Sequence, residues 1–203
     1  MKKRYRQHIN PLAMSSLAPR QPLQLGEADR VVVELGCADA RFLIELARHR
    51  APPNTLHLGL DIRLAFIEEG LAAAAELGNV RLETCNLIVD TPHLFAPGRV
   101  AEFYINFPDP WFKRRQQNRR WLTSETLDHL VRALRPGGRI FFQSDVWTVA
   151  LEALGLFERH DALHNDCGAW TWLRENPYPA RSTRELLCLR DGLPIWRLLF
   201  VRR

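Results

Sequence analysis

The sequence predicts an α/β domain in which a mostly parallel sheet carries helices on both faces. Segments of strand length, rich in β-branched and apolar residues, alternate with segments whose apolar residues recur at helical spacing. This alternation is typical of parallel strands joined by crossover helices. Two more apolar segments near the C-terminus are separated only by "DGLP", which predicts a tight turn at Asp191-Gly192 and an antiparallel strand at or near one sheet edge. The 203 residues suit one domain of fair size.

The elements follow one another in order along the chain. The first strand is the β-branched run "VVVEL", and the helix after it, "ARFLIELARHR", ends before "APPN". Gly78-Asn79 are expected to end the second helix, and Thr123 or Ser124 to begin the third as its N-cap. The turn "PGG" leads into the fifth strand. The predicted strands are residues 31–35, 56–62, 80–85, 101–107, 139–144, about 184–190 and about 195–202, and the predicted helices are residues 40–50, 64–77, 124–135 and about 147–159.

Positive charge is concentrated in one short stretch. The net charge is only +5, from 28 Lys and Arg against 23 Asp and Glu. Five basic residues nevertheless lie within eight positions that include no acid: Lys113, Arg114, Arg115, Arg119 and Arg120. Clustered positive charge indicates a polyanionic partner, although a solvated basic face would show the same pattern. Residues 1–28, with five basic side chains and one acid, are interpreted as a partly ordered basic arm ahead of a single domain over residues 29–203.

The cysteines and the hydropathy pattern limit the class of protein. Cys37, Cys85, Cys167 and Cys188 are widely spaced and form no CxxC pair, so neither a metal site nor a redox pair is predicted. No apolar run approaches the roughly 18 residues that a membrane-spanning helix needs. We therefore expect a cytoplasmic protein without a membrane partner. An organelle transit peptide is the alternative, because the N-terminal segment bears arginine and is poor in acids.

A polar or acidic side chain follows each of the first five predicted strands. In such folds the ligand binds outside the carboxyl ends of the strands, which selects these positions. Gly36 begins a turn of small residues, "GCADA", that lets the backbone approach a ligand. Asp61 is placed to accept both hydroxyls of a ribose, unless it pairs with Arg63 or caps a helix, and Asn86 is placed to read an adenine edge. The set favours a nucleoside-bearing ligand.

The segment after the fourth strand, "NFPDPWFKRRQQNRR", places one acid beside aromatic and basic residues. Pro108 and Pro110 end the strand and stiffen the loop, because proline fixes φ and donates no hydrogen bond. Asp109 between them is then presented in a defined direction, and its carboxylate can accept from the edge of a guanine or adenine base. Trp111 and Phe112 could stack on that base, and the basic run would hold phosphates. A surface turn anchored by a buried tryptophan is the alternative.

Several motifs occur in the order and spacing of a known family. They are "RQHINPL", "ELGCADARFLIELA", "LGLDIR", "CN", "FPDPWFKRR", "LRPGGRIFFQSD", and "STRE" followed by "GLPIWRLLF". With them the chain resembles, over nearly its whole length, the tRNA (guanine-N7-)-methyltransferase family, the TrmB-type enzymes, and "FPDPWFKRR" is the most specific of these motifs. The resemblance implies a Rossmann-like methyltransferase fold that binds S-adenosyl-L-methionine (SAM). It also implies methylation of N7 of a guanosine in the tRNA variable loop, at position 46.

The resemblance implies roles for individual residues. The positions that match cofactor-binding residues are Glu34, Gly36, Asp61, Asn86 and Asp109. Asp109 is also the candidate catalytic residue. The positions that match substrate- and RNA-binding residues are Lys113, Arg114, Arg115, Arg119, Arg120, Asp145, Thr183, Arg184 and Glu185. The implied partner is tRNA, with no obligate protein partner, and a monomer or a homodimer is expected.

One departure from the family pattern lies in the turn after the first strand. The family usually shows GxGxG there, and this chain has Ala38 and Ala40 in place of two glycines. Wherever the turn requires a positive φ, an alanine costs on the order of 1 kcal/mol and adds a methyl group near the cofactor. We still expect an active enzyme, because the rest of the pattern is retained.

The expected chemistry needs no proton abstraction. Guanine N7 carries a lone pair and no proton, so methyl transfer requires alignment and not a general base. Asp109 is therefore expected to orient the guanine or to hold the amino group of the methionine part of SAM. The alternatives are a nucleic-acid methyltransferase acting on an exocyclic amine, a non-catalytic tRNA-binding paralogue with a degenerate cofactor loop, and a nucleotide-binding oxidoreductase. The missing GxGxxG argues against the last of these.

Overall fold

The computed structural model describes residues 9–13, 22–49, 52–111 and 113–203. Most of the predicted arm over residues 1–28 lies outside these ranges, and so does Phe112 of the predicted stacking pair. In the described part of the chain, no helix is both long enough and apolar enough to cross a membrane.

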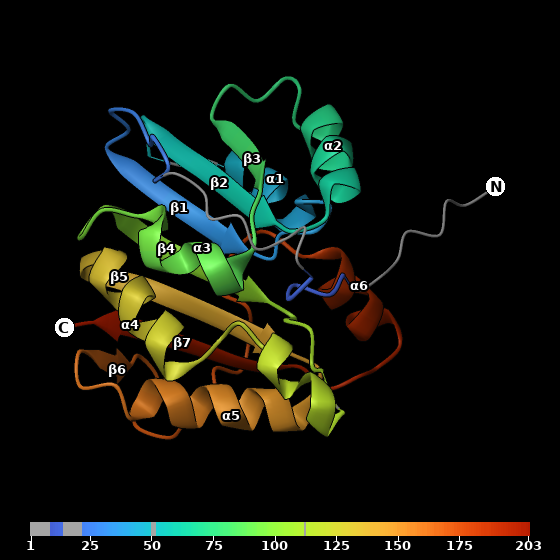
Figure 1. The fold of residues 1–203 in the computed structure, drawn as a ribbon, viewed down its shortest axis with the longest axis vertical. Coiled ribbons are helices and arrows are strands. Elements are labelled where there is room, and N and C mark those ends of the chain that lie inside the picture. Colours follow the sequence, from blue (N-terminus) through green and yellow to red (C-terminus); the bar gives the residue numbers. More distant parts are fainter. Residues whose placement is uncertain (1–8, 14–21, 50–51, 112) are drawn as a thin grey trace.

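A twisted sheet runs through the middle of the described structure (Figure 1). Its strand order is β3-β2-β1-β4-β5-β7-β6. The first five strands are parallel, and β7 is antiparallel to both β5 and β6. The strands are β1 (Arg30–Leu35), β2 (Thr55–Asp61), β3 (Val80–Thr84), β4 (Val100–Asn106), β5 (Leu134–Ser144), β6 (Leu163–Asn165) and β7 (Trp196–Arg202). The prediction of a mostly parallel sheet with an antiparallel strand near one edge is confirmed.

Helices cover both faces of the sheet, as predicted (Figure 1). They are α1 (Arg41–Arg48), α2 (Leu64–Ala73), α3 (Leu87–Leu94), α4 (Ser124–Ala133), α5 (Trp147–Glu158) and α6 (Thr183–Arg190), with the 3-10 helix η2 (Arg114–Arg119) between β4 and α4. On one face Phe103 and Phe142 pack with Leu130 of α4 and Phe157 of α5. On the other face the alternate strand residues, such as Tyr104, pack against Phe42 of α1, because successive side chains of a strand point to opposite faces.

The predicted C-terminal hairpin is wrong in its first half. Residues 184–190 form helix α6 and not a strand. Ser182 begins the helix, since its side chain accepts a hydrogen bond from the Glu185 backbone N–H at 3.1 Å. Glu185 and Cys188, three residues apart, are fully buried, which is the spacing of one helical face. The second half, β7, is confirmed, but its antiparallel partners are β5 and the short strand β6, which was not predicted.

Smaller differences have local causes. Helix α3 was not predicted, because "LIVDTPHL" contains a proline and β-branched residues that disfavour helices. Its buried residues Leu87 and Leu94 pack into the core, and this packing outweighs the propensity. Helix α2 ends at Ala73, earlier than the predicted 77. In the predicted "PGG" turn Gly137 has a φ of 71°, and residues 135–138 loop out of the ladder, since Val100 pairs with Leu134 and Glu102 with Arg139.

Candidate functional site

A crevice is expected where β1 and β4 lie side by side. The chain runs outward from β1 through β2 to β3, and from β4 through β5 in the opposite direction, so the strand order reverses between these two neighbours. Open α/β sheets bind their ligands at the carboxyl ends of the strands at such a switch point. The structure has two adjoining cavities there.

The two cavities share a wall. The first, called the Asp61 cavity, is lined by residues that include Ile9, Asp61, Asn86, Ile88, Trp111 and Arg119. The second, called the Glu34 cavity, is lined by residues that include Glu34, Ala38, Phe42, Asp145, Thr183 and Arg184. Both are bordered by Gly36, Arg63, Asn106, Phe107, Pro108 and Asp109. The site residues predicted at the ends of separate strands are thus brought together.

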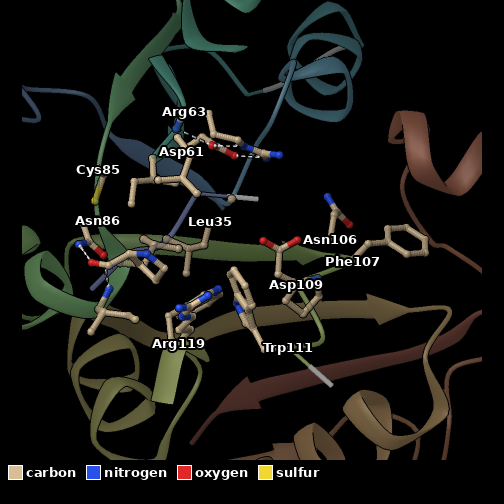
Figure 2. A pocket seen from close by; sticks show the side chains of 18 residues that line it. Leu35, Asp61, Arg63, Cys85, Asn86, Asn106, Phe107, Asp109, Trp111 and Arg119 are labelled. Atoms are coloured by element: carbon tan, nitrogen blue, oxygen red, sulfur yellow. Dashed lines mark hydrogen bonds and ion pairs between the residues drawn. The ribbon is translucent and has the colours of Figure 1, made fainter. Parts of the chain in front are cut away.

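Asp61, at the end of β2, is buried and fully hydrogen-bonded (Figure 2). Its Oδ2 accepts from the Ala38 backbone N–H at 2.9 Å, and its Oδ1 accepts from the Arg63 backbone N–H at 2.9 Å. The Arg63 guanidinium completes a bidentate ion pair at 2.8 and 2.7 Å, which is the alternative considered for this residue. Four hydrogen bonds fill the lone-pair sites of a carboxylate. A ribose can therefore bind Asp61 only after the Arg63 side chain moves.

The turn between β1 and α1 is strained. Gly36, Ala38 and Ala40 have φ values of 79°, 49° and 55°. The left-handed region costs an L-residue roughly 1–2 kcal/mol, whereas glycine enters it freely. The condition under which the two alanines were expected to matter is met at both positions. Because the Ala38 N–H also bonds Asp61, the strained turn lies directly beside the Asp61 carboxylate.

Glu34, near the end of β1, is a buried carboxylate that borders the Glu34 cavity. Glu34 is only 2% exposed. Oε1 accepts from Asn106 Nδ2 at 2.7 Å, whereas no group of the described residues hydrogen-bonds Oε2. Burial raises the pKa of Glu34 to about 8, although the hydrogen bond from Asn106 acts to lower it. A buried acceptor without a partner costs about 1–3 kcal/mol, which a donor from a ligand would offset.

Asn86 makes more contacts within the protein than the sequence suggested. Its Oδ1 accepts from the Ile88 backbone N–H at 3.2 Å, which caps α3. Its Nδ2 donates to the Pro11 carbonyl at 2.8 Å. Pro11 and Ile9 line the Asp61 cavity. Asn86 therefore anchors the described segment 9–13 against this cavity, a contact that sequence reasoning missed.

The loop after β4 places Asp109 where the two cavities meet. Figure 2 shows its side chain among the residues that line the first of them. Phe107 and Trp111, which flank Pro108-Asp109-Pro110, have φ values of 52° and 42°. Bulky residues rarely adopt this region, and strained backbone of this kind concentrates at functional sites. Asp109 itself is exposed. The two prolines were expected to restrict the backbone around Asp109. The positive φ values of Phe107 and Trp111 show that the loop is constrained on both sides of them as well.

The end of the basic run supports this loop. The Arg119 guanidinium lies over the Trp111 ring, 5.2 Å from its centroid (Figure 2). Arg120 Nε donates to the Pro110 carbonyl at 3.0 Å, and its guanidinium pairs with Glu152 of α5. The start of the run differs, because its exposed basic residues are Lys113, Arg114 and Arg115. The last two arginines of the run therefore contact the Asp109 loop, whereas its first three basic residues form an exposed surface.

The first turn of α6 and the nearby Asp145 both border the Glu34 cavity. Thr183 Oγ1 donates to Asp39 Oδ2 at 2.7 Å, and the half-exposed Arg184 pairs with Asp145. Glu185 of the same turn is 0% exposed and does not line this cavity. Its Oε1 accepts from Arg197 Nη2 at 3.0 Å. Asp145, Thr183 and Arg184 therefore line the Glu34 cavity, whereas Glu185 does not.

Sequence reasoning missed two buried polar residues at the cavities, one that borders them and one behind it. Asn106 ends β4 and Gln143 lies near the end of β5, and the two amides hydrogen-bond each other at 2.9 Å. The available signal was a polar residue at the same place in two apolar strands, "AEFYIN" and "RIFFQS". Among the described residues, no group of three or more His, Cys, Asp or Glu side chains is arranged to hold a metal ion.

Comparison with known proteins identifies the family. A family described as "Putative methyltransferase" matches residues 28–198. A tRNA (guanine-N(7)-)-methyltransferase of Synechococcus sp. (strain JA-3-3Ab) is 36% identical over 207 residues, which cover 98% of this chain and 86% of the relative. A relative of the same name from Nostoc sp. (strain PCC 7120 / SAG 25.82 / UTEX 2576) is 35% identical and covers 98% of this chain and 94% of its own length. The chain belongs to this methyltransferase family.

The family expected from the motifs is thereby confirmed, and so is the fold. A SAM dependent methyltransferase from Aquifex aeolicus superimposes with a TM-score of 0.54 at 10% sequence identity, covering 86% of this chain and 82% of that chain. At this identity the similarity concerns the fold alone. It confirms the Rossmann-like methyltransferase architecture.

Proposed function

We propose that the protein transfers a methyl group from SAM to N7 of a guanosine in the tRNA variable loop, at position 46. The observation that carries this proposal is Asp109, exposed on a strained loop at the junction of two cavities and followed directly by an exposed basic segment. Methylating an RNA base requires a cofactor cavity, a base cavity and a phosphate-binding surface at one point. The activity named for the relatives supports the proposal.

The residues of the two cavities fit SAM. The ammonium group of its methionine part needs a buried acceptor, and Glu34 Oε2 is such an atom. Its ribose suits the Asp61 carboxylate once Arg63 has moved, and apolar residues such as Ile9 and Ile88 suit the adenine. When bound, SAM supplies an electrophilic methyl group on a sulfonium.

Asp109 is proposed to orient the guanine. The Watson–Crick edge of guanine presents two adjacent N–H donors, and an ionised carboxylate accepts from both. Holding that edge fixes the direction of the N7 lone pair, which is the alignment that the reaction requires. Glu34 is the better acceptor for the SAM ammonium, because it is buried and one of its oxygens lacks a partner among the described groups, whereas Asp109 is exposed.

The exposed start of the basic run is proposed to bind tRNA phosphates. Lys113, Arg114 and Arg115 are exposed and follow the Asp109 loop directly. Arg119 and Arg120 act mainly by keeping that loop in place, since each already contacts it. The Arg184–Asp145 pair borders the Glu34 cavity, where the base would enter.

A tRNA-binding protein without methyltransferase activity is the second candidate. The observation that favours it is the positive φ of Ala38 and Ala40, because each adds strain and a methyl group where a glycine would add neither. In this case tRNA would bind and SAM would not.

Two measurements test the proposal. The first is calorimetric titration of the protein with SAM. The second is transfer of a labelled methyl group from SAM to two unmodified tRNA transcripts that differ only in guanosine or adenosine at the variable-loop position. We expect SAM to bind and label to enter only the guanosine transcript. Binding of tRNA without binding of SAM would support the second candidate, and equal labelling of both transcripts would place the reaction at another base.

A further inference from the structure

Beneath the two cavities, buried polar side chains form one continuous hydrogen-bonded chain. Glu34 Oε1 accepts from Asn106 Nδ2 at 2.7 Å, and Asn106 Oδ1 accepts from Gln143 Nε2 at 2.9 Å. Gln143 Nε2 also donates to Glu185 Oε2 at 3.0 Å. These residues come from β1, β4, β5 and α6, and their exposures are 2%, 8%, 0% and 0%. The chain thus passes from the Glu34 cavity, under the sheet surface, to the helix that borders the same cavity.

Glu185, the last residue of this hydrogen-bonded series, is held by several other side chains. Arg197 Nη2 donates to Glu185 Oε1 at 3.0 Å, and Asn176 Nδ2 donates to Glu185 Oε2 at 3.0 Å. Arg181 Nε lies 3.4 Å from Glu185 Oε1. Breaking a buried ion pair by removing one partner is strongly unfavourable. The position of the Glu185 carboxylate is therefore set by the protein and not by a ligand.

The orientation of each amide then follows from Glu185. An ionised carboxylate accepts only, so Gln143 must turn its N–H groups toward Glu185 and Asn106. Its Oε1 consequently faces Arg197, whose Nε donates to it at 3.2 Å. Asn106, which accepts from Gln143, must in turn present its own N–H group to Glu34. The donor to Glu34 Oε1 is thereby specified, and Oε2 keeps no hydrogen-bond partner among the described residues.

We propose that Gln143 is a positioning residue that joins the cofactor side of the site to the substrate side. Through Asn106 it orients Glu34, which we assign to the SAM ammonium group. Through Glu185 it holds the first turn of α6, which carries Thr183 and Arg184 at the cavity wall. This inference rests on the proposed function. Its consequence is that one substitution, at a residue lining neither cavity, weakens the binding of SAM and of tRNA together.

The test replaces Gln143 with methionine, which keeps the volume and removes every hydrogen bond. The matched control is Tyr178→Phe, which removes one hydrogen bond of 2.8 Å to the carboxylate of Glu102 away from the two cavities. For Q143M we expect the KM for SAM and the KM for tRNA each to rise about tenfold, with kcat changed less than about threefold. The dissociation constant of SAM, measured by calorimetry without tRNA, should rise by the same factor. Y178F should leave all of these constants within about twofold.

Three results would overturn the proposal. If kcat falls while both KM values are unchanged, the substitution only lowers the amount of folded protein. If a single KM rises, Gln143 does not couple the two sides. If Q143M behaves like Y178F, the hydrogen bonds from Glu34 to Glu185 have no role in the binding of SAM or tRNA.

A second variant covers a failure of Q143M to fold. Gln143→Asn keeps a buried amide but shortens the side chain by one methylene, so it no longer spans Asn106 and Glu185. We expect it to raise the SAM dissociation constant several-fold; an unchanged constant would overturn the proposal. Wild-type protein that neither binds SAM nor methylates tRNA would refute the proposed function itself. An active wild type with unaffected variants would refute only the role of Gln143.

Discussion

Replacing Glu34 with glutamine should stabilise the ligand-free protein and weaken its binding of SAM. Glu34 is buried, and its pKa is raised from 4.5 to about 8 mainly by burial. Since the pKa is higher in the folded state, the unfolded chain releases this proton first as the pH rises. The folded state therefore loses stability as the pH increases from about 4.5 to about 8, and below that window the effect is absent.

The magnitude follows from the size of the shift. At pH 7 the solution is about 2.5 units above the ordinary pKa of 4.5 but still below the folded value of about 8. At 1.36 kcal/mol per unit, holding the proton at pH 7 costs the folded state roughly 3 kcal/mol. Glutamine does not ionise, so E34Q removes this cost. It also removes the carboxyl group that would ionise beside the SAM ammonium group and hold it, so SAM should bind at least about tenfold more weakly.

Urea denaturation at several pH values measures the effect. The free energies of unfolding of wild type and E34Q should agree within about 1 kcal/mol at pH 4.5 and differ by roughly 3 kcal/mol at pH 7. The control is E185Q, because Glu185 is equally buried but paired with Arg197. Removing one partner of a buried pair costs about 3–5 kcal/mol, so E185Q should be less stable than wild type. An E34Q protein that is less stable than wild type at pH 7 would refute the reasoning.

Three further substitutions test other parts of the site. Asp109→Asn replaces an acceptor with a donor toward guanine and should lower kcat/KM on the order of a hundredfold without changing the SAM dissociation constant; nearly normal turnover would remove Asp109 from the mechanism. Arg115→Ala should reduce the salt dependence of tRNA binding, the slope of log K against log salt, by about 0.7–0.9, whereas Arg135→Ala, an exposed arginine at the opposite end of the sheet, should leave it unchanged. Ala38→Gly should tighten SAM binding and raise the melting temperature slightly, because relief of about 1 kcal/mol of strain exceeds the added entropy of the unfolded chain; a lower melting temperature would contradict the strain argument.

The order of elements and the location of the site were predictable from the sequence. Five strands were placed to within a few residues, because each is a short β-branched or apolar run between clear turns. The carboxyl ends of parallel strands meet at one edge, so acids such as Asp61 and Asp109 had to lie near each other. The Asp61–Arg63 pair was foreseen as an alternative for a similar reason, since the two residues are only two positions apart.

Helix α6 was not predictable in the same way. "RELLCLR" mixes polar and apolar residues in an order that suits either a strand or a short helix. The choice is made by tertiary contacts, because Glu185 finds Gln143 and Arg197 only in the folded sheet. Without the helix, the direction of the Glu185 side chain was unknown, and a supporting residue could not be separated from a ligand-contacting one.

The hydrogen bonds that link Glu34 to Glu185 could not be predicted from the sequence either, because their partners meet only in the folded structure. Asn106 and Glu34 are 72 residues apart, and Gln143 and Glu185 are 42 residues apart. Whether a polar residue in an apolar strand is buried with a partner depends on strand register and on the packing of α6. Neither the strand register nor the packing of α6 is indicated by the residues next to these positions in the sequence.

The central claim is methylation of guanine N7, and the most direct test removes that atom. Two tRNA transcripts would be made by ligation, identical except for guanosine or 7-deazaguanosine at the variable-loop position, and incubated with the protein and labelled SAM. We predict that the guanosine transcript takes up one methyl group and becomes susceptible to chain cleavage at that base, and that the 7-deazaguanosine transcript, which keeps every other edge of the base, takes up none. Equal labelling of both transcripts would show that an exocyclic amine or another nucleotide is the acceptor and would contradict the account.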